Sequence, residues 1–231
     1  MLNNDVCYIC GKLFDSNTQI TTEHCLPKQL YKRPRPNNLI TLKACFDCNN
    51  KYSKDEEYFT DTVLLQVAKL NPYASELWES RIIDIHNHAV KKPRYRQFLR
   101  NNLTGALSIY SPGGIYLGDA NGTKVKIDRI INVIEKIVKW LYFKHNNKVL
   151  TQTPDIYINN MMKLDEFTMN VKVVPNYNDE IKELINFSEK IVIHPEVFTY
   201  CYLNTKEKDS FGIFMHLVFY NNFTCTVFIM M

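Results

Sequence analysis

The sequence predicts a mixed α+β protein with a small zinc-stapled N-terminal module, a helical connector and a larger C-terminal part that contains antiparallel strands. Two Cys-x-x-Cys pairs frame the first fifty residues, which is typical of a bound metal ion. Apolar residues recur at helical spacing over residues 129–143. The last part of the chain is dense in aromatic and β-branched residues separated by turn residues, which indicates strands.

The composition allows a substantial folded core and gives little information on function. The chain has 231 residues, of which 45% are hydrophobic, so it can form one large domain or two small ones. Its net charge of +4 permits nucleic-acid binding without requiring it. No apolar run reaches the roughly 18 residues that a membrane-spanning helix needs. The first residues lack a basic head and an apolar run, so we expect no signal peptide, no membrane partner and a cytoplasmic protein.

The cysteine spacing is the strongest single signal in the chain. Four of the 7 cysteines form two C-x2-C pairs, which predicts a tetrahedral structural Zn²⁺ site with the ligands Cys7, Cys10, Cys45 and Cys48. A closed four-cysteine site leaves no coordination position for water, so any hydrolytic chemistry needs a second site. Cys201 and Cys225 lie in apolar runs and are expected to be core thiols. Two roles are considered for Cys25: packing in the core, or supporting the neighbouring His24.

Residues 1–70 are expected to form one unit around the zinc ion. Residues 18–22 have β-propensity and lead into Glu23 and His24, and Pro27 ends this strand. A second short strand is expected at residues 39–42. A helix is predicted from near Cys48 to about residue 70, where Asn71-Pro72 ends it.

Residues 71–104 are expected to form a helical, basic connector. Helices are predicted within residues 74–101, with a break at Pro93. Aromatic residues are interleaved with a basic run, which suits either a phosphate backbone or a solvated helix face. The residues of this run are Lys91, Lys92, Arg94, Tyr95, Arg96, Phe98 and Arg100.

Residues 105–231 are expected to form an α+β part that selects a target, a protein partner or a second copy of the chain. Strands are predicted within residues 106–127, with turns at 111–114 and 119–122. The helix at 129–143 would be capped by Asp128. After a short helix near 178–187, an antiparallel meander is predicted over three segments with a tight turn at the Asn-Asn pair of residues 221–222. These segments are residues 197–203, 211–220 and 223–230.

Four motifs follow one another in the N-terminal part of the chain: Cys7-x2-Cys10, Glu23-His24-x2-Pro27, Asn38-Leu39 and Cys45-x2-Cys48-Asn49. Taken together, they resemble the HNH endonuclease family, which is also called the ββα-metal or His-Me finger nucleases. The similarity covers about residues 5–60.

The resemblance implies a second, catalytic metal site and assigns roles around it. His24 would be the general base, and Asn38 would brace the loop and orient that base. Glu23 and Asn49 would bind the catalytic ion, although the adjacent Asn50 is an alternative ligand. The chain departs from the family in having Glu where Asp is commoner and Asn where His is commoner. Oxygen ligands favour Mg²⁺ or Mn²⁺ as the cofactor.

Two functions are therefore carried forward. In the first, the resemblance implies a metal-dependent endonuclease that hydrolyses DNA phosphodiester bonds in phage defence, restriction or a mobile element. The metal would stabilise the pentavalent phosphate and the leaving 3′ oxygen. In the second, the chain is a catalytically silent, zinc-stabilised module that binds nucleic acid or protein. The pair Glu23-His24 discriminates between the two functions, because a module that only binds nucleic acid or protein does not need a metal ligand next to a general base.

Overall fold

The structure is a computed structural model that describes residues 5–87, 103–110, 115–123, 125–158, 163–164, 171–172, 179–207 and 210–230. The basic run at residues 91–100, its break at Pro93 and the turn expected at 111–114 lie outside the described residues. Mixed α+β structure with antiparallel sheets is confirmed.

The N-terminal segment folds in the order strand, strand, helix. Strand β1 (Ile20–His24) pairs antiparallel with β2 (Thr41–Cys45). The link between them contains a short 3-10 helix, η1 (Lys28–Leu30). Helix α1 (Phe46–Lys51) follows β2 without a loop, and the Phe46 N–H donates a 2.9 Å hydrogen bond to the carbonyl oxygen of Gln19. This bond fixes the start of α1 beside the start of β1.

The single helix expected from Cys48 to residue 70 is two helices. Helix α1 starts two residues earlier than expected, and α2 (Ser53–Val67) begins after a break at Tyr52. The side chain of Tyr52 is only 6% exposed, so the break coincides with a residue that turns into the core. Asn71 and Pro72 start the next helix, α3 (Pro72–Asn87). The Ala74 N–H bonds the Asn71 side-chain oxygen at 3.0 Å, and proline suits the first helical position because it has no N–H to satisfy.

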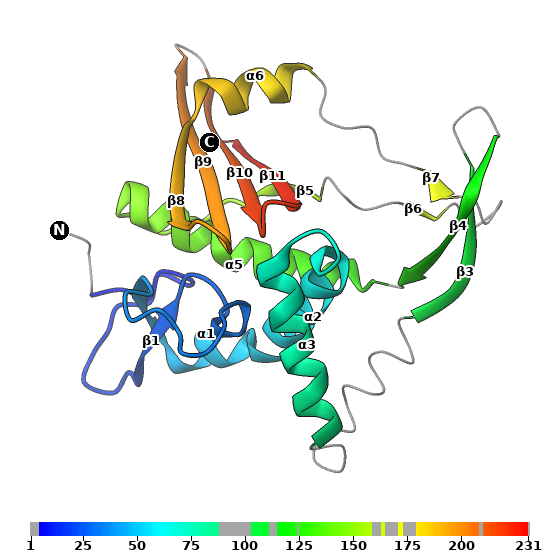
Figure 1. The fold of residues 1–231 in the computed structure, drawn as a ribbon. Helices are drawn as coiled ribbons and strands as arrows, with labels where there is room; N and C mark the ends of the chain where they lie inside the picture. The colour runs from blue at the N-terminus through cyan, green and yellow to red at the C-terminus, as the bar shows by residue number, and fades with distance from the viewer. Residues whose placement is uncertain are drawn as a thin grey trace.

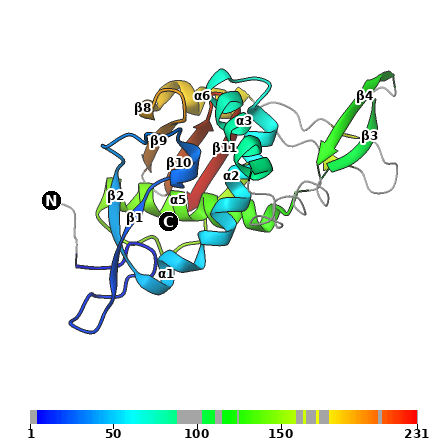
Figure 2. The ribbon, with the colours of Figure 1, turned by 60° about the horizontal axis from the view of Figure 1, so that its bottom comes forward.

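Helix α5 (Ile127–Asn146) lies between the N-terminal segment and the C-terminal sheet (Figure 1, Figure 2). It buries an apolar face that includes Ile130, Ile134 and Trp140, as its spacing predicts. The residue that precedes it is Lys126, so Asp128 lies in the first helical turn and is not the cap. Asn147 ends the helix in the left-handed conformation, with φ of 54°.

The predicted C-terminal meander is confirmed as part of a five-stranded antiparallel sheet with the order β5-β11-β10-β9-β8. Strands β9, β10 and β11 correspond to the three expected segments, and α6 (Asp179–Phe187) corresponds to the expected short helix. Strands β5 and β8 at the two edges were not predicted. The bounds of the strands are β5 Asp155–Ile158, β8 Glu189–His194, β9 Phe198–Glu207, β10 Ser210–Phe219 and β11 Phe223–Met230.

The prediction of a turn at residues 119–122 is wrong. These residues lie inside β4 (Tyr116–Thr123), which pairs antiparallel with β3 (Leu103–Tyr110), with Asp119 in register with Ser108. Strand pairing therefore overrides the low β-propensity of Asp, Asn and Gly at this place. A further pair of short strands comprises β6 (Lys163–Leu164) and β7 (Val171–Lys172).

The N-terminal helices and the C-terminal sheet share one apolar core. Buried side chains from Cys7 to Ile229 form a single contiguous cluster. Within it, Phe59 of α2 packs edge-on against Phe219 of β10, with ring centroids 5.3 Å apart. No helix in the described part of the chain is long and apolar enough to cross a membrane.

Candidate metal centres

The four cysteines of the two C-x2-C pairs come together at the base of the β1–β2 hairpin. Their sulfur atoms all lie within 4.8 Å of one another, and Cys10 Sγ and Cys45 Sγ are 3.9 Å apart. A tetrahedral zinc–thiolate site with bonds of about 2.3 Å separates its sulfurs by roughly 3.8 Å. The four side chains therefore could hold a zinc ion with little rearrangement.

The surroundings of these sulfur atoms favour the thiolate form at Cys7 and disfavour it at Cys48. Burial acts to raise the pKa of Cys7, but backbone N–H groups of Cys10, Cys45 and Ile9 outweigh it, so the pKa is lowered. Burial and the neighbouring sulfurs Cys45 and Cys7 raise the pKa of Cys48. Four thiolates this close repel one another, so a divalent cation is the natural partner of the set.

The two faces of the β1–β2 hairpin have different characters. Side chains alternate along a strand, and residues paired across strands share a face. Thr21 and Glu23 therefore share the inner face with their partners Ala44 and Leu42, both of which are buried. The outer, more exposed face carries Thr22, His24, Thr41 and Lys43.

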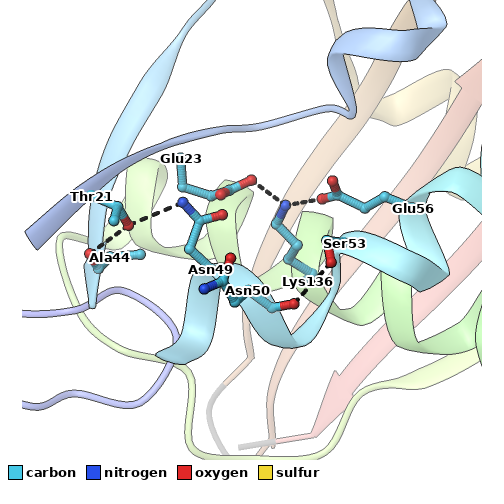
Figure 3. A network of polar contacts seen from close by, with 8 residues as sticks. All are labelled: Thr21, Glu23, Ala44, Asn49, Asn50, Ser53, Glu56 and Lys136. Carbon is cyan, nitrogen blue, oxygen red and sulfur yellow. Dashed lines mark hydrogen bonds and ion pairs between the residues drawn. The ribbon is translucent and has the colours of Figure 1, made fainter. Parts of the chain in front are cut away.

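Asn49 of α1 places its side chain against the inner face of the hairpin, which carries Glu23. Its Nδ2 donates a 3.0 Å hydrogen bond to Thr21 Oγ1, and that hydroxyl donates to the Ala44 carbonyl at 3.0 Å. The Asn49 amide is thereby oriented, with its oxygen on the side of the Glu23 carboxylate (Figure 3). Asn50 is exposed, and its backbone carbonyl accepts a hydrogen bond from Ser53. Of the two asparagines, Asn49 has the anchored side chain.

Glu23 is engaged in a buried ion-pair network that crosses three elements. Lys136 of α5 donates through Nζ to Glu23 Oε1 of β1 and to Glu56 Oε1 of α2 (Figure 3). Lys136 is 1% exposed and Glu23 is 7% exposed, whereas Glu56 lies nearer the surface. We call these three residues the Lys136 triad.

The Lys136 triad shows that the position beside Glu23 suits a cation. Burial raises the pKa of Glu23, and the Lys136 ammonium opposes that shift. Two carboxylates and one ammonium carry a formal charge of −1, so the network retains negative charge. With the Asn49 amide oxygen on the same face, the donors are the hard oxygen atoms that Mg²⁺ or Mn²⁺ prefers. Glu23 could bind such an ion only when Lys136 is not paired with it.

His24 is the last residue of β1 and lies on the opposite face from Glu23. The Cys25 N–H bonds the Ile40 carbonyl at 3.2 Å, which continues the hairpin just past His24. Burial lowers the pKa of His24, and the positive charges of Lys28, Lys136 and Arg35 add to this shift. The imidazole is therefore neutral at neutral pH, as a proton acceptor must be.

Of the remaining residues that the sequence singles out, Asn38 is exposed and three cysteines are buried. Asn38 lies exposed in the turn before β2. Cys25 is 3% exposed, and burial raises the pKa of its thiol to about 12, so it packs as an inert core residue. Cys201 and Cys225 are also buried, as the sequence predicts.

Sequence reasoning missed Lys136, Glu56 and Thr21. Lys136 has a local signal: it lies between Val133 and Trp140 at helical spacing, on a face that otherwise buries apolar side chains. A lysine at such a position needs a buried partner. The partner itself has no local signal, because Glu23 is 113 residues away.

No family model matches the chain, and no curated protein or solved structure matches it. The similarity to HNH endonucleases therefore remains a prediction that depends on the motif residues and their arrangement.

Proposed function

We propose that the chain is a metal-dependent endonuclease of the HNH type that hydrolyses phosphodiester bonds in DNA, with residues 20–51 as its ββα-metal module. One observation carries the proposal. Asn49, in the helix directly after the hairpin, has its amide nitrogen anchored on Thr21, and its oxygen lies on the side of Glu23. The four clustered cysteines, which could hold a zinc ion, come from the chain segments on either side of this hairpin, and this supports a rigid site on a small scaffold.

In this proposal, Glu23 and Asn49 would hold a Mg²⁺ or Mn²⁺ ion, and the chemistry that the ion would supply is stabilisation of negative charge on the phosphate and on the leaving 3′ oxygen. His24 accepts a proton from the attacking water through its neutral imidazole. Lys28 and Arg35, whose charges act on His24, attract the phosphate to the end of the hairpin. Lys43 shares the outer face with His24 and extends this basic surface.

A second candidate function has its own supporting observation. Glu23 is buried and ion-paired with Lys136, so the expected metal ligand already has a partner. A zinc-stabilised module that only binds nucleic acid or protein has no use for a free carboxylate at this position. The basic surface around His24 would then bind phosphates without cleaving them.

Cleavage of supercoiled plasmid with Mg²⁺ and with Mn²⁺ separates the two candidates. We expect the zinc-loaded wild-type chain to nick the plasmid and His24→Ala to lose about 100-fold or more of that activity. His145→Ala is the matched control, because His145 lies at the end of α5, where its ring packs against Tyr200 and Tyr202 and not against the hairpin, so this variant should keep full activity. Equal cleavage by wild type and His24→Ala would contradict the nuclease proposal. Equal plasmid binding without cleavage would favour the binding module.

A further inference from the structure

The Lys136 triad connects the C-terminal half of the chain to the expected metal ligand. One ammonium serves two carboxylates, Glu23 on β1 and Glu56 on α2, and it reaches them from α5 (Figure 3). The lysine is almost completely buried. A buried ammonium is stable only when paired, so Lys136 needs at least one of the two carboxylates at all times.

The two carboxylates differ in their surroundings, and this difference suggests different roles. Glu23 is deeply buried on the inner face of the hairpin, and the Asn49 side chain of α1 is bonded to Thr21 on that same face. Glu56 is 20% exposed, on a helix that packs against α5. If a divalent ion takes Glu23, Lys136 can remain paired with Glu56, and no buried charge is left without a partner.

We propose that Lys136 is a built-in competitor for the catalytic metal ion: its ammonium occupies the cation position at Glu23, and the metal binds when Lys136 moves over to Glu56 alone. This inference rests on the proposed function and adds a regulator to the same site. Because Lys136 belongs to α5, which packs between the hairpin and the C-terminal sheet, a displacement of α5 changes the metal affinity of the site (Figure 1).

Mn²⁺ binding to the zinc-loaded full-length chain tests the inference without DNA. Free Mn²⁺ is followed by electron paramagnetic resonance, and zinc content is checked before and after the titration. We expect Lys136→Met to bind Mn²⁺ about tenfold tighter than wild type, because the competitor is gone. We expect Glu56→Gln to bind it about tenfold weaker, because Lys136 then has only Glu23 as a charged partner. A lysine that only supports the fold would not shift the affinity in opposite directions in these two variants.

Two controls sharpen the test. Lys139→Met removes a neighbouring, half-buried lysine of the same helix that pairs at 2.6 Å with Glu135 and not with the triad, and its Mn²⁺ affinity should equal that of wild type. The double variant Lys136→Met/Glu56→Gln should bind Mn²⁺ nearly as tightly as Lys136→Met, since Glu56 acts through Lys136. If the double variant loses the gain, Glu56 is a direct metal ligand and the competitor model is wrong.

The stability of Lys136→Met gives a second readout. Without Lys136 the carboxylates of Glu23 and Glu56 repel each other, so we expect this variant to melt at a lower temperature than wild type and to recover stability as Mn²⁺ is added. A variant that folds only with Mn²⁺ supports the inference. A variant that stays unfolded at saturating Mn²⁺, or that folds but binds Mn²⁺ no tighter than wild type, overturns it. Neither outcome depends on cleavage, so the nuclease proposal can stand or fail separately.

Discussion

The hydroxyl group of Tyr220, in the turn between β10 and β11, donates a 2.7 Å hydrogen bond to the carbonyl oxygen of Leu30, at the end of η1. The backbone of Tyr220 is also fully engaged: its N–H bonds Val197 at 2.9 Å, and its carbonyl accepts from Asn71 at 2.8 Å. These bonds hold Tyr220 in the left-handed region, with φ of 51°, which aromatic residues seldom adopt. The loop that follows His24 is thus tied to the C-terminal sheet.

Tyr220→Phe should destabilise the protein by about 1–3 kcal/mol, because it leaves the buried Leu30 carbonyl without its hydrogen-bond donor. The ring itself is retained, so little packing is lost. Urea unfolding of the zinc-loaded chain measures the change. Tyr157→Phe is the control, since Tyr157 is 57% exposed and should change stability by less than about 0.5 kcal/mol. Equal stability of both variants would show that the bond to Leu30 contributes nothing.

The cysteine cluster makes a prediction about metal content. The wild-type chain should contain one zinc ion, and Cys48→Ser should lose it, because a serine hydroxyl replaces one of four thiolates. Zinc binding is coupled to folding in such sites, so the variant should also lose the β1–β2 hairpin. Elemental analysis and protease sensitivity of residues 5–51 measure these two effects.

Cys201→Ser is the matched control for the zinc prediction. Cys201 is buried in β9, away from the cluster, so its replacement should leave the zinc content unchanged even if it lowers stability. Full zinc occupancy in Cys48→Ser would mean that the four sulfurs do not form the site.

Local signals were sufficient for the parts of the fold whose residues specify them directly. The C-x2-C spacing, the apolar face of α5 and the dense strands from Phe198 onward all have short sequence periods, and the structure places each as expected. The hairpin was also predicted. Strand β1 starts two residues later than the β-prone stretch that begins at residue 18, and β2 starts two residues later and ends three residues later than the expected strand at 39–42.

The remaining features depend on contacts between distant residues. The turn expected at residues 119–122 is overridden by pairing with β3, and the edge strand β5 is defined by β11 rather than by its own residues. The Lys136 triad joins positions 23, 56 and 136, so no sequence window contains it. The proximity of Asn49 to the Glu23 face was an expectation from family resemblance, and its anchor, Thr21, became visible only in three dimensions.

Thr21→Val should release the Asn49 amide without changing either of the two proposed metal ligands, Glu23 and Asn49. Valine keeps the shape of threonine but cannot accept the 3.0 Å hydrogen bond from Asn49 Nδ2. The amide then samples orientations in which its oxygen points away from Glu23, and we expect Mn²⁺ affinity and DNA cleavage to fall by about tenfold. Zinc content should remain at one ion per chain.

Thr22→Val provides the control for this prediction, because Thr22 lies on the outer face of the same strand, one residue away. Its Mn²⁺ affinity should equal that of wild type. If Thr21→Val also binds Mn²⁺ normally, Asn49 does not need its anchor or is not a ligand.

His216 should make stability depend on pH. It lies in β10 between Cys201 and Thr226 of the neighbouring strands, it is 6% exposed, and burial lowers its pKa to about 4. Above the ordinary pKa of 6.5, the imidazole is neutral in both the folded and the unfolded chain and contributes no pH dependence. As the pH falls from 6.5 toward 4, the unfolded chain binds a proton that the folded chain does not, so the free energy of unfolding decreases. Between pH 7 and pH 5 this loss amounts to about 2 kcal/mol.

His216→Gln removes the titration while keeping a polar side chain of similar size. Urea unfolding near pH 7 and near pH 5 should therefore show a smaller loss of stability for the variant than for wild type, whatever the absolute stability of the variant. His24 and His145 also have lowered pKa values and contribute a loss of the same sign, but they titrate in both proteins and cancel in the comparison. An identical pH dependence in the two proteins would mean that His216 is protonated as readily in the folded chain as in the unfolded one, and that burial in β10 does not exclude the charge.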